Sequence, residues 1–286
     1  MNRGGQLVLL AIVSVCALIS FAWPFFSSSE ADEFIAPLVA MTMLPALLVI
    51  ASLALDRSIA NGTTVAMLGV LAAVGTVLRV LGTGFGGFEL VFTVVILSAA
   101  AFGIRFGFLL GLTTMVVSSL VWGGLGPWTA FQAFALGWVG AGAGLVSKIW
   151  VARGGVRPTW RRLVLLAVYG IGASYAFGAL MNLWFWPIAV GGNTDISFVA
   201  GAPTLENLRR FVGYTLVTST LTWDTVRAVT TVVGILLTGG IVLRALSRAA
   251  TQRSTLPPGG GRQTRRSTVL DEVAVPPTTP RPRARA

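Results

Sequence analysis

Four charged residues beside long apolar segments are the side chains of this chain best suited to chemistry. Arg79 and Glu89 flank a glycine-rich turn, and Asp224 and Arg227 lie three residues apart at the start of the last apolar segment. A spacing of three puts two side chains on one face of a helix, and a charge at a bilayer needs a partner or access to water. The sequence predicts that Arg79 pairs with Glu89. For Asp224 it allows two compatible interpretations: a cap on the following helix, or a place with the other three charges in a polar ring around a ligand.

The segment 123–132, with the sequence GGLGPWTAFQ, separates two apolar segments. Lipid cannot satisfy the amide groups of such irregular backbone, so it must line a cavity or face water. Aromatic and amide residues gather at the same level. A single tryptophan there more often anchors the chain at the interface, but the group as a whole is typical of a small-molecule pocket. The candidate ligand contacts are Phe85, Trp122, Trp128, Phe131, Gln132, Asn182, Trp184, Trp186 and Asn193.

The composition indicates lipid as the main solvent and excludes several kinds of site. Hydrophobic residues make up 55% of the chain and charged residues 11%, with a mean hydropathy of +0.81. Cys16 is the only cysteine and the sequence has no histidine, which excludes a disulfide scaffold, a His/Cys metal site and a Cys/His nucleophile. The acidic residues are scattered and the sequence has no G-x-x-x-x-G-K-[ST] motif. We therefore expect no cofactor, no metal and no enzymatic activity of the chain itself.

An all-α, polytopic membrane bundle has to position these residues. Apolar runs matched to a hydrocarbon core of ~30 Å predict eight spans, at 6–21, 35–55, 64–81, 88–102, 106–122, 130–149, 163–187 and 225–246. Basic residues cluster at 148–162 and 244–253, so the positive-inside rule predicts a multi-pass plasma-membrane protein with both termini in the cytoplasm. A helix at 205–218 is expected across the external surface, where it would lid the pocket.

The predicted spans divide the chain into three parts. We expect a two-helix membrane extension at 1–60, a six-helix domain at 61–248 and a disordered basic tail at 249–286. The tail is rich in proline, glycine, threonine and arginine, which is too polar to bury a core. Its positive charge is typical of contact with anionic lipid head groups, and no motif for binding nucleic acid accompanies it.

Small residues in the third predicted span are a separate signal. Ala66, Gly69 and Ala73 are spaced so that another helix could approach closely, as small residues allow in lipid. Packing within the bundle is the ordinary explanation of such a pattern. Docking of another membrane subunit is the alternative.

Three sequence blocks resemble a known family. They are VLRVLGTGFGGFELVFTVVILSAAAFGIRFGFLLG, then GLGPWTAFQAFALGWVGAGAG, then TSTLTWDTVRAV near the last span. Together they look like the substrate-binding S component of energy-coupling factor (ECF) vitamin importers, over about 63–248. The resemblance implies a six-helix core that captures ligand from outside with its first, third and fifth loops, here 82–87, 123–129 and 189–223. It also implies that Gly69 and Ala73, in place of the usual AxxxA, meet the coupling transmembrane subunit.

We therefore expect the substrate-capture subunit of an ECF-type ABC importer. Its partners would be a coupling transmembrane subunit, two ABC ATPases and a vitamin-like ligand. Flat or bulky ligands such as corrinoids or flavins suit a tryptophan-rich mouth, and so do thiamine-like pyrimidines. A stand-alone secondary transporter is the first alternative, although the sequence places the charges near span ends rather than at mid-membrane. A membrane-embedded lipid-modifying enzyme is the second, and it would need clustered acids or a nucleophile with its base.

Overall fold

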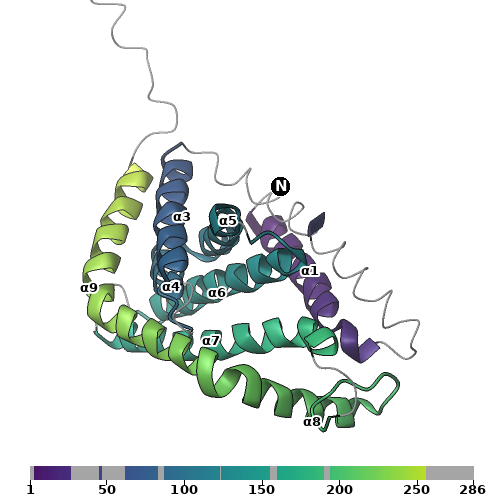
Figure 1. The fold of residues 1–286 in the computed structure, drawn as a ribbon. Helices are drawn as coiled ribbons and strands as arrows, with labels where there is room; N and C mark the ends of the chain where they lie inside the picture. Colours follow the sequence, from purple (N-terminus) through teal and green to yellow (C-terminus); the bar gives the residue numbers. More distant parts are fainter. Residues whose placement is uncertain are drawn as a thin grey trace, which may run out of the picture. The chain divides into compact units, whose positions relative to one another are not determined.

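The computed structural model describes residues 3–26, 45–46, 62–82, 87–122, 124–154, 160–189 and 194–255. They are helical between short turns, and no strand occurs among them. The elements, labelled in Figure 1 where there is room, are α1 (Arg3–Phe21), the 3-10 helix η1 (Trp23–Phe26), α3 (Gly62–Gly82), α4 (Val91–Phe102), α5 (Ile104–Trp122), α6 (Pro127–Ala152), α7 (Trp160–Ala189), α8 (Thr204–Thr215), the π-helix η2 (Leu216–Asp224) and α9 (Thr225–Thr255).

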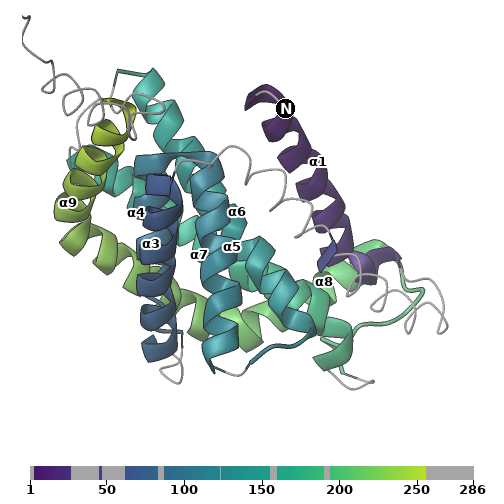
Figure 2. The same cartoon turned by 90° about the horizontal axis from the view of Figure 1, so that it is seen from above.

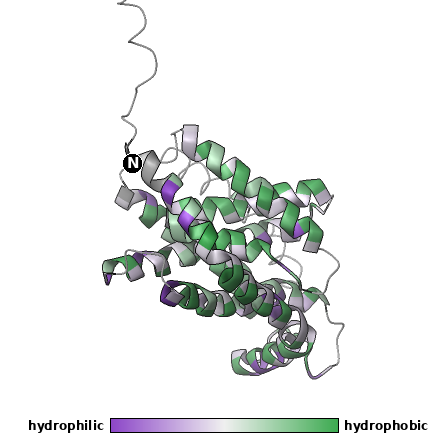
Figure 3. Ribbon diagram, turned by 90° about the vertical axis from the view of Figure 1, so that its left-hand side faces the viewer, coloured by the Kyte–Doolittle hydropathy of each residue, from purple (hydrophilic) through white to green (hydrophobic). Residues whose placement is uncertain are grey.

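Six helical segments of the described chain are long and apolar enough to cross a membrane. Figure 3 shows hydrophobic residues along most of their length. The prediction of a multi-pass helical membrane protein is therefore confirmed in this coarse form. Helix α4 coincides with a predicted span but has only 12 residues. Nearly all of the predicted span 35–55, the boundary at 60 and the tail from 256 onward lie outside the described residues.

Two helices at the centre, α5 and α6, approach so closely that glycine is required between them. A Cβ atom added to Gly107 would overlap the backbone of Gly140, and one added to Gly140 would overlap Gly107. Gly111 meets the backbone of Leu136 in the same way. The glycine spacing in α5 therefore serves packing inside the bundle, where small residues let helices approach in lipid.

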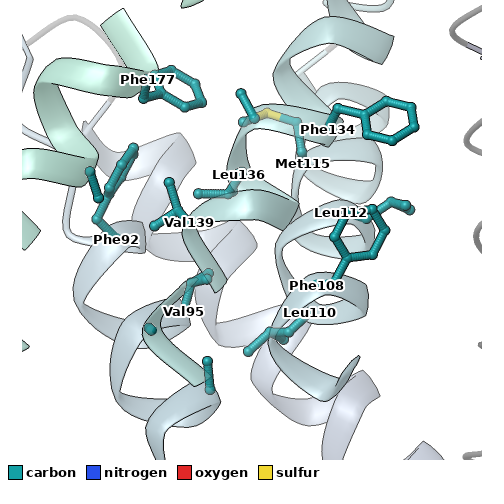
Figure 4. Close-up of a cluster of buried hydrophobic side chains, with 14 of the residues drawn as sticks. Phe92, Val95, Phe108, Leu110, Leu112, Met115, Phe134, Leu136, Val139 and Phe177 are labelled. Atoms are coloured by element: carbon teal, nitrogen blue, oxygen red, sulfur yellow. The ribbon is translucent and has the colours of Figure 1, made fainter. Parts of the chain in front are cut away.

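Aromatic and branched side chains fill the core around this contact (Figure 4). The ring of Phe92 on α4 lies edge-on to that of Phe177 on α7, with 5.3 Å between centroids. On the other side of the core, Phe108 on α5 and Phe134 on α6 pack with 6.0 Å between centroids. All four side chains are buried. The core thus joins α4, α5, α6 and α7, the helices that carry most of the candidate site.

A group of basic residues lies at one end of these helices, here called the basic end. Arg162, near the start of α7, donates hydrogen bonds to the carbonyl oxygen of Ala100 (2.8 Å) and to Ser147 Oγ (2.7 Å). Arg105, at the start of α5, donates to the side-chain oxygen of Gln6. The end of α4, the later part of α6 and the starts of α1, α5 and α7 therefore meet here. This grouping is the one that the positive-inside argument requires, although the side of the membrane stays a prediction.

The last three elements form one continuous helical run from Thr204 to Thr255, through α8, η2 and α9. Figure 1 shows the run changing direction between α8 and the far end of α9. The predicted helix at 205–218 is thus present, but it is joined to the last span. The capping interpretation of Asp224 is wrong, because the backbone stays helical from η2 through Asp224 into α9. Asp224 therefore does not lie at the free N-terminus of a helix.

Candidate functional site

A connected set of polar side chains lies between α4, α7, η2 and α9. Arg227 donates from Nε to Glu89 Oε2 at 2.9 Å and from Nη1 to Asp224 Oδ1 at 2.7 Å. Ser219 Oγ donates to the other oxygen of Asp224 at 2.8 Å, and Asn182 Nδ2 donates to Ser219 Oγ at 2.8 Å. The side chains of Arg227 and Asp224 are only 7% and 1% exposed. A buried charge is tolerated only when it is paired and hydrogen-bonded, as both are here.

The π-helix η2 explains how Ser219 and Asp224 come to face the same way. The two residues are five apart, a spacing that points them to different sides of an α-helix. The wider turn of a π-helix, with its i→i+5 hydrogen bonds, brings them onto one face. π-helical segments are rare and are frequent at functional sites, and this one spans nine residues.

Close packing from α7 and α4 encloses the Asp224–Arg227 pair. A Cβ atom on Gly178 would overlap the Asp224 carboxylate, so only glycine leaves room for it. The guanidinium of Arg227 lies over the rings of Phe92 and Phe177, at 5.5 and 5.0 Å from their centroids. Such cation–π contacts favour the charge where water is excluded.

Helix lengths give the distance of this network from the basic end. Glu89 lies just before α4, whose first residue, Val91, is nine residues before Ala100, or about 14 Å at 1.5 Å per residue. Ser174 accepts a hydrogen bond from Arg227 and lies twelve residues after Arg162, or about 18 Å along α7. The network therefore lies away from the basic end and beside the N-terminal end of α4. The expectation that these charges lie near span ends stays a prediction.

A second polar cluster joins α3, α5 and α6. Arg79 donates to Ser118 Oγ at 3.1 Å and to Gln132 Oε1 at 3.2 Å. Glu89 forms an ion pair with Arg227 and also interacts electrostatically with Arg79. The two hydrogen-bonded clusters are therefore linked by charge, and direct contact of Arg79 with Glu89 stays a prediction.

The predicted aromatic residues fall into a buried and an exposed group. Phe131 and Trp184 stack with 4.6 Å between centroids, and both are buried, as is Trp186. We call the end of the bundle at which these three lie the aromatic end. Trp122 and Trp128 are 57% and 43% exposed, which suits interfacial anchors. Phe85 and Asn193 lie outside the described residues.

The N-terminal segment covers the aromatic end. The ring of Phe21 lies edge-on to Phe131, with 4.9 Å between centroids. Trp23 donates from its indole nitrogen to the carbonyl oxygen of Trp184 at 3.1 Å. Phe25 reaches the ring of Trp186, with centroids 6.5 Å apart. Side chains of the protein itself therefore occupy the space between the predicted aromatic contacts.

The turns at this end of the bundle are held to one another. Gly87 has a φ of +90°, and a Cβ there would lie 2.5 Å from the carbonyl oxygen of Trp223 in η2. The α3–α4 turn therefore touches the α8–α9 run. The α5–α6 turn is closed by hydrogen bonds from Trp128 Nε1 to the Gly124 oxygen (3.1 Å) and from the Gly126 amide to Thr129 Oγ1 (3.0 Å). Gln132 links this second turn to α3 through Arg79.

Three cavities in the described part of the chain lie away from the predicted contacts. One of about 510 Å³ lies between α6 and α7 near the basic end, beside Trp150 and Arg153. One of about 350 Å³ lies further along the same two helices, beside Trp138 and Tyr169. One of about 1090 Å³ lies along α8. None of the predicted ligand contacts that the structure describes lines these three cavities.

The predicted partner interface lies on an open face of α3. Ala66, Gly69 and Ala73 are all exposed, and a Cβ added to Gly69 would meet nothing within 4 Å. These small residues therefore do not serve packing inside the described bundle, in contrast to the glycines of α5.

Sequence reasoning missed several residues of the site. Ser219, Gly178 and the rings of Phe92 and Phe177 support the predicted pair Asp224–Arg227. A run of hydroxyl residues, TSTLT at 218–222, immediately before Trp223 and Asp224 is a signal that could have identified Ser219. Nothing local in the sequence identifies Gly178 as the residue that faces Asp224.

The fold and the site define a multi-pass helical membrane protein with a buried, ion-paired polar network. Comparison with protein-family models, with curated proteins and with solved structures finds no match to this chain. Function therefore has to be argued from the residues themselves.

Proposed function

We propose that this protein is the substrate-capture membrane subunit of an ECF-type ABC importer. The observation that carries the proposal is that polar residues and loops from several helices gather at one end of the bundle. Polar residues from α3, α6, α7, η2 and α9, with Glu89 before α4, gather in the half of the bundle away from the basic end. Two of the loops that the family resemblance assigns to ligand capture meet at the same end, through Gly87 and Trp223, and the helices beside the first and third loops are joined there by the hydrogen bond of Arg79 with Gln132. A capture site built from several loops requires such a meeting.

The proposed ligand is a vitamin-like molecule that enters from the aromatic end. The buried rings of Phe131, Trp184 and Trp186 would supply apolar walls, and Gln132, Asn182 and Glu89 would supply polar contacts, as in typical small-molecule sites. Because Phe21 and Trp23 now pack on these rings, binding requires the N-terminal segment or the turns to move outward.

In this proposal the protein lies in the plasma membrane with its basic end and both termini in the cytoplasm. ATP hydrolysis belongs to two ABC ATPases, which act through a coupling transmembrane subunit. The exposed small residues Ala66, Gly69 and Ala73 on α3 would let a helix of that subunit approach closely.

Co-purification tests the proposal directly. Tagged protein is extracted from its native membrane in mild detergent, and the proteins that accompany it are identified by mass spectrometry. We expect a coupling membrane subunit and ABC ATPases. Repeated recovery of the protein alone, under conditions that keep membrane complexes intact, would contradict the proposal.

A matched pair of variants separates docking from folding. Gly69→Leu fills the open face of α3, and Gly172→Leu fills an equally open position on α7, since a Cβ at either glycine meets nothing within 4 Å. We expect the α3 variant to lose the partners and the α7 variant to keep them. Equal recovery of partners with both variants would contradict the assigned docking face.

A stand-alone secondary transporter is the second candidate, and the buried ionisable pair Asp224–Arg227, with Glu89 beside it, favours this candidate. Ionisable residues inside a membrane often mark proton or ion pathways. Vesicles that contain this protein alone distinguish the two candidates. Solute uptake that depends on an imposed pH gradient, and that stops when the gradient is collapsed, would favour the transporter over the importer subunit.

A further inference from the structure

Helix α8 carries two apolar faces, and only one of them packs on the protein. On the inner face, Phe211 and Tyr214 lie against Trp186, with centroids 5.5 and 6.5 Å apart. Asn207 fixes the rotation of the helix, because its side chain donates to the Val199 oxygen at 2.8 Å and accepts from the Val199 amide at 3.2 Å. These inner contacts therefore determine which residues of α8 face outward.

The outer face is a row of large apolar side chains. Leu205, Leu208, Val212 and Leu216 are 78%, 44%, 49% and 44% exposed. Their spacing of three, four and four residues places them on one side of the helix. Polar residues border the row: Arg209 is exposed, and Glu206 pairs with Arg210 at 2.8 Å. A helix with this division of residues is typical of the boundary between water and lipid.

The row is continuous with the exposed apolar surface of a candidate membrane span. It extends along the same helical run through the exposed residues Val217 and Leu221 of η2 to Val229 and Val233 of α9, and α9 lies in that candidate span. The candidate segment, Thr204–Ala249, has 46 residues, or about 69 Å of helix. This is more than twice the ~30 Å core, so part of the segment has to lie outside the core, and the apolar row favours a position along the membrane surface for α8.

The groove beside the row has the chemistry of a phospholipid site. It encloses about 1090 Å³ and is lined by Leu205, Leu208 and Val212 together with Arg209 and Arg210. Apolar side chains suit acyl chains, and arginine suits the phosphate group through charge-assisted hydrogen bonds. Asp195 and Glu206 also line the groove, which limits its net positive charge.

We propose that α8 is an interfacial helix whose outer row, Leu205, Leu208, Val212 and Leu216, lies among the acyl chains of membrane phospholipids. Arg209 then lies at the level of their phosphate groups. This inference does not rest on the proposed function, because an importer subunit and a secondary transporter would both carry such a helix. A lid over the ligand site would move through water when it closes. In this proposal the bilayer instead holds α8 at the membrane surface, and η2 joins α8 directly to Asp224.

Spin labelling in lipid vesicles tests the inference. Single cysteines at Leu208 and Val212 are introduced into a Cys16→Ser background, labelled, and reconstituted in vesicles of phosphatidylethanolamine and phosphatidylglycerol. Leu237→Cys, on an exposed position of α9, gives the lipid reference, and Glu206→Cys gives the polar side of α8. Oxygen partitions into lipid and a nickel chelate into water, so their relaxation effects report the environment of each label.

We expect the ratio of oxygen to nickel accessibility at Leu208 and Val212 to match that at Leu237 and to exceed that at Glu206 several-fold. A ratio equal to that at Glu206 would show a water-facing row. Protection from both reagents would show that another protein or a second copy covers it. Either result would overturn the proposal. Leu205→Cys, the most exposed position of the row, repeats the test if labelling at Leu208 disturbs folding.

Discussion

Arg227 is the residue on which the buried network depends. It bonds to Glu89 before α4, to Asp224 at the end of η2 and to the Ser174 carbonyl of α7. A buried ion pair adds little to the stability of the folded protein compared with an apolar replacement of both residues. Removing only one partner is strongly destabilising, because it leaves an unpaired buried charge. The network should therefore respond very differently to single and double replacement.

Arg227→Met should destabilise the folded protein strongly, by about 3–5 kcal/mol, because it leaves Asp224 charged and unpaired. Arg227→Met combined with Asp224→Asn should recover part of that loss. Thermal unfolding in detergent measures both. Arg210→Met on α8 is the control, since it removes an exposed pair of a kind worth about 0–1 kcal/mol. A double variant less stable than the single one would refute the pairing argument.

Two glycines of α7 make a sharper comparison. Gly178→Ala should destabilise the protein by about 1–3 kcal/mol, the usual effect of overpacking, because the new methyl group would overlap the Asp224 carboxylate. Gly172→Ala has open space and should be neutral or stabilising by up to about 1 kcal/mol, since alanine favours helix. Both are measured by the same unfolding assay. Equal effects at the two positions would contradict the assigned contact.

At the scale of elements, two irregular helices create the site. The short α4 begins only at Val91 and leaves Glu89 just before its first turn, where Glu89 meets Arg227, and the π-helix η2 turns Ser219 and Asp224 to one face. Neither property follows from hydropathy, which reports only that both segments are apolar. Each element is held in place by contacts from other helices.

Arg162 holds the C-terminal end of α4 against α6 and α7. Its guanidinium bonds to the carbonyl of Ala100 in the last turn of α4, where the helix dipole favours a positive charge. Arg162→Met should cost about 1–3 kcal/mol, because Ala100 and Ser147 lose a buried charged donor. Arg161→Met, at an exposed neighbouring position, should change stability by less than about 0.5 kcal/mol. Unfolding midpoints that fall equally for both variants would contradict this role.

At the scale of the whole molecule, the two ends differ in charge and in aromatic content. Arg105, Arg153 and Arg162 mark one end, and Trp184 and Trp186 mark the other. In a membrane such an asymmetry sets orientation through the positive-inside rule. The basic end should therefore face the cytoplasm.

Labelling with a membrane-impermeant maleimide measures the orientation. In a Cys16→Ser background, Leu125→Cys in the exposed α5–α6 turn should react in intact cells. Arg153→Cys at the basic end should react only after the membrane is made permeable. The reverse pattern would show that the predicted orientation is inverted, and the proposed capture of ligand from outside would fail with it.

The sequence by itself determined that the protein is a helical membrane protein, and it gave the approximate position of most spans. These follow from local properties: apolar runs of bilayer length, glycine and proline breaks, and clusters of basic residues. It also placed Asp224 and Arg227 on one helix face, because the direction of residues three apart is a local property of a helix. Short-range chemistry is sufficient for such statements.

Only the tertiary structure decided which distant groups meet. Glu89 and Arg227 are 138 residues apart, and the partner of Glu89 depends on how far α4 extends and on how α7 and α9 cross it. Arg79 forms a hydrogen bond with Gln132, 53 residues away, and the predicted pocket aromatics pack on Phe21 and Trp23. Apolar pattern cannot choose among such partners, because in lipid the fit of surfaces and the satisfaction of buried polar groups select the packing.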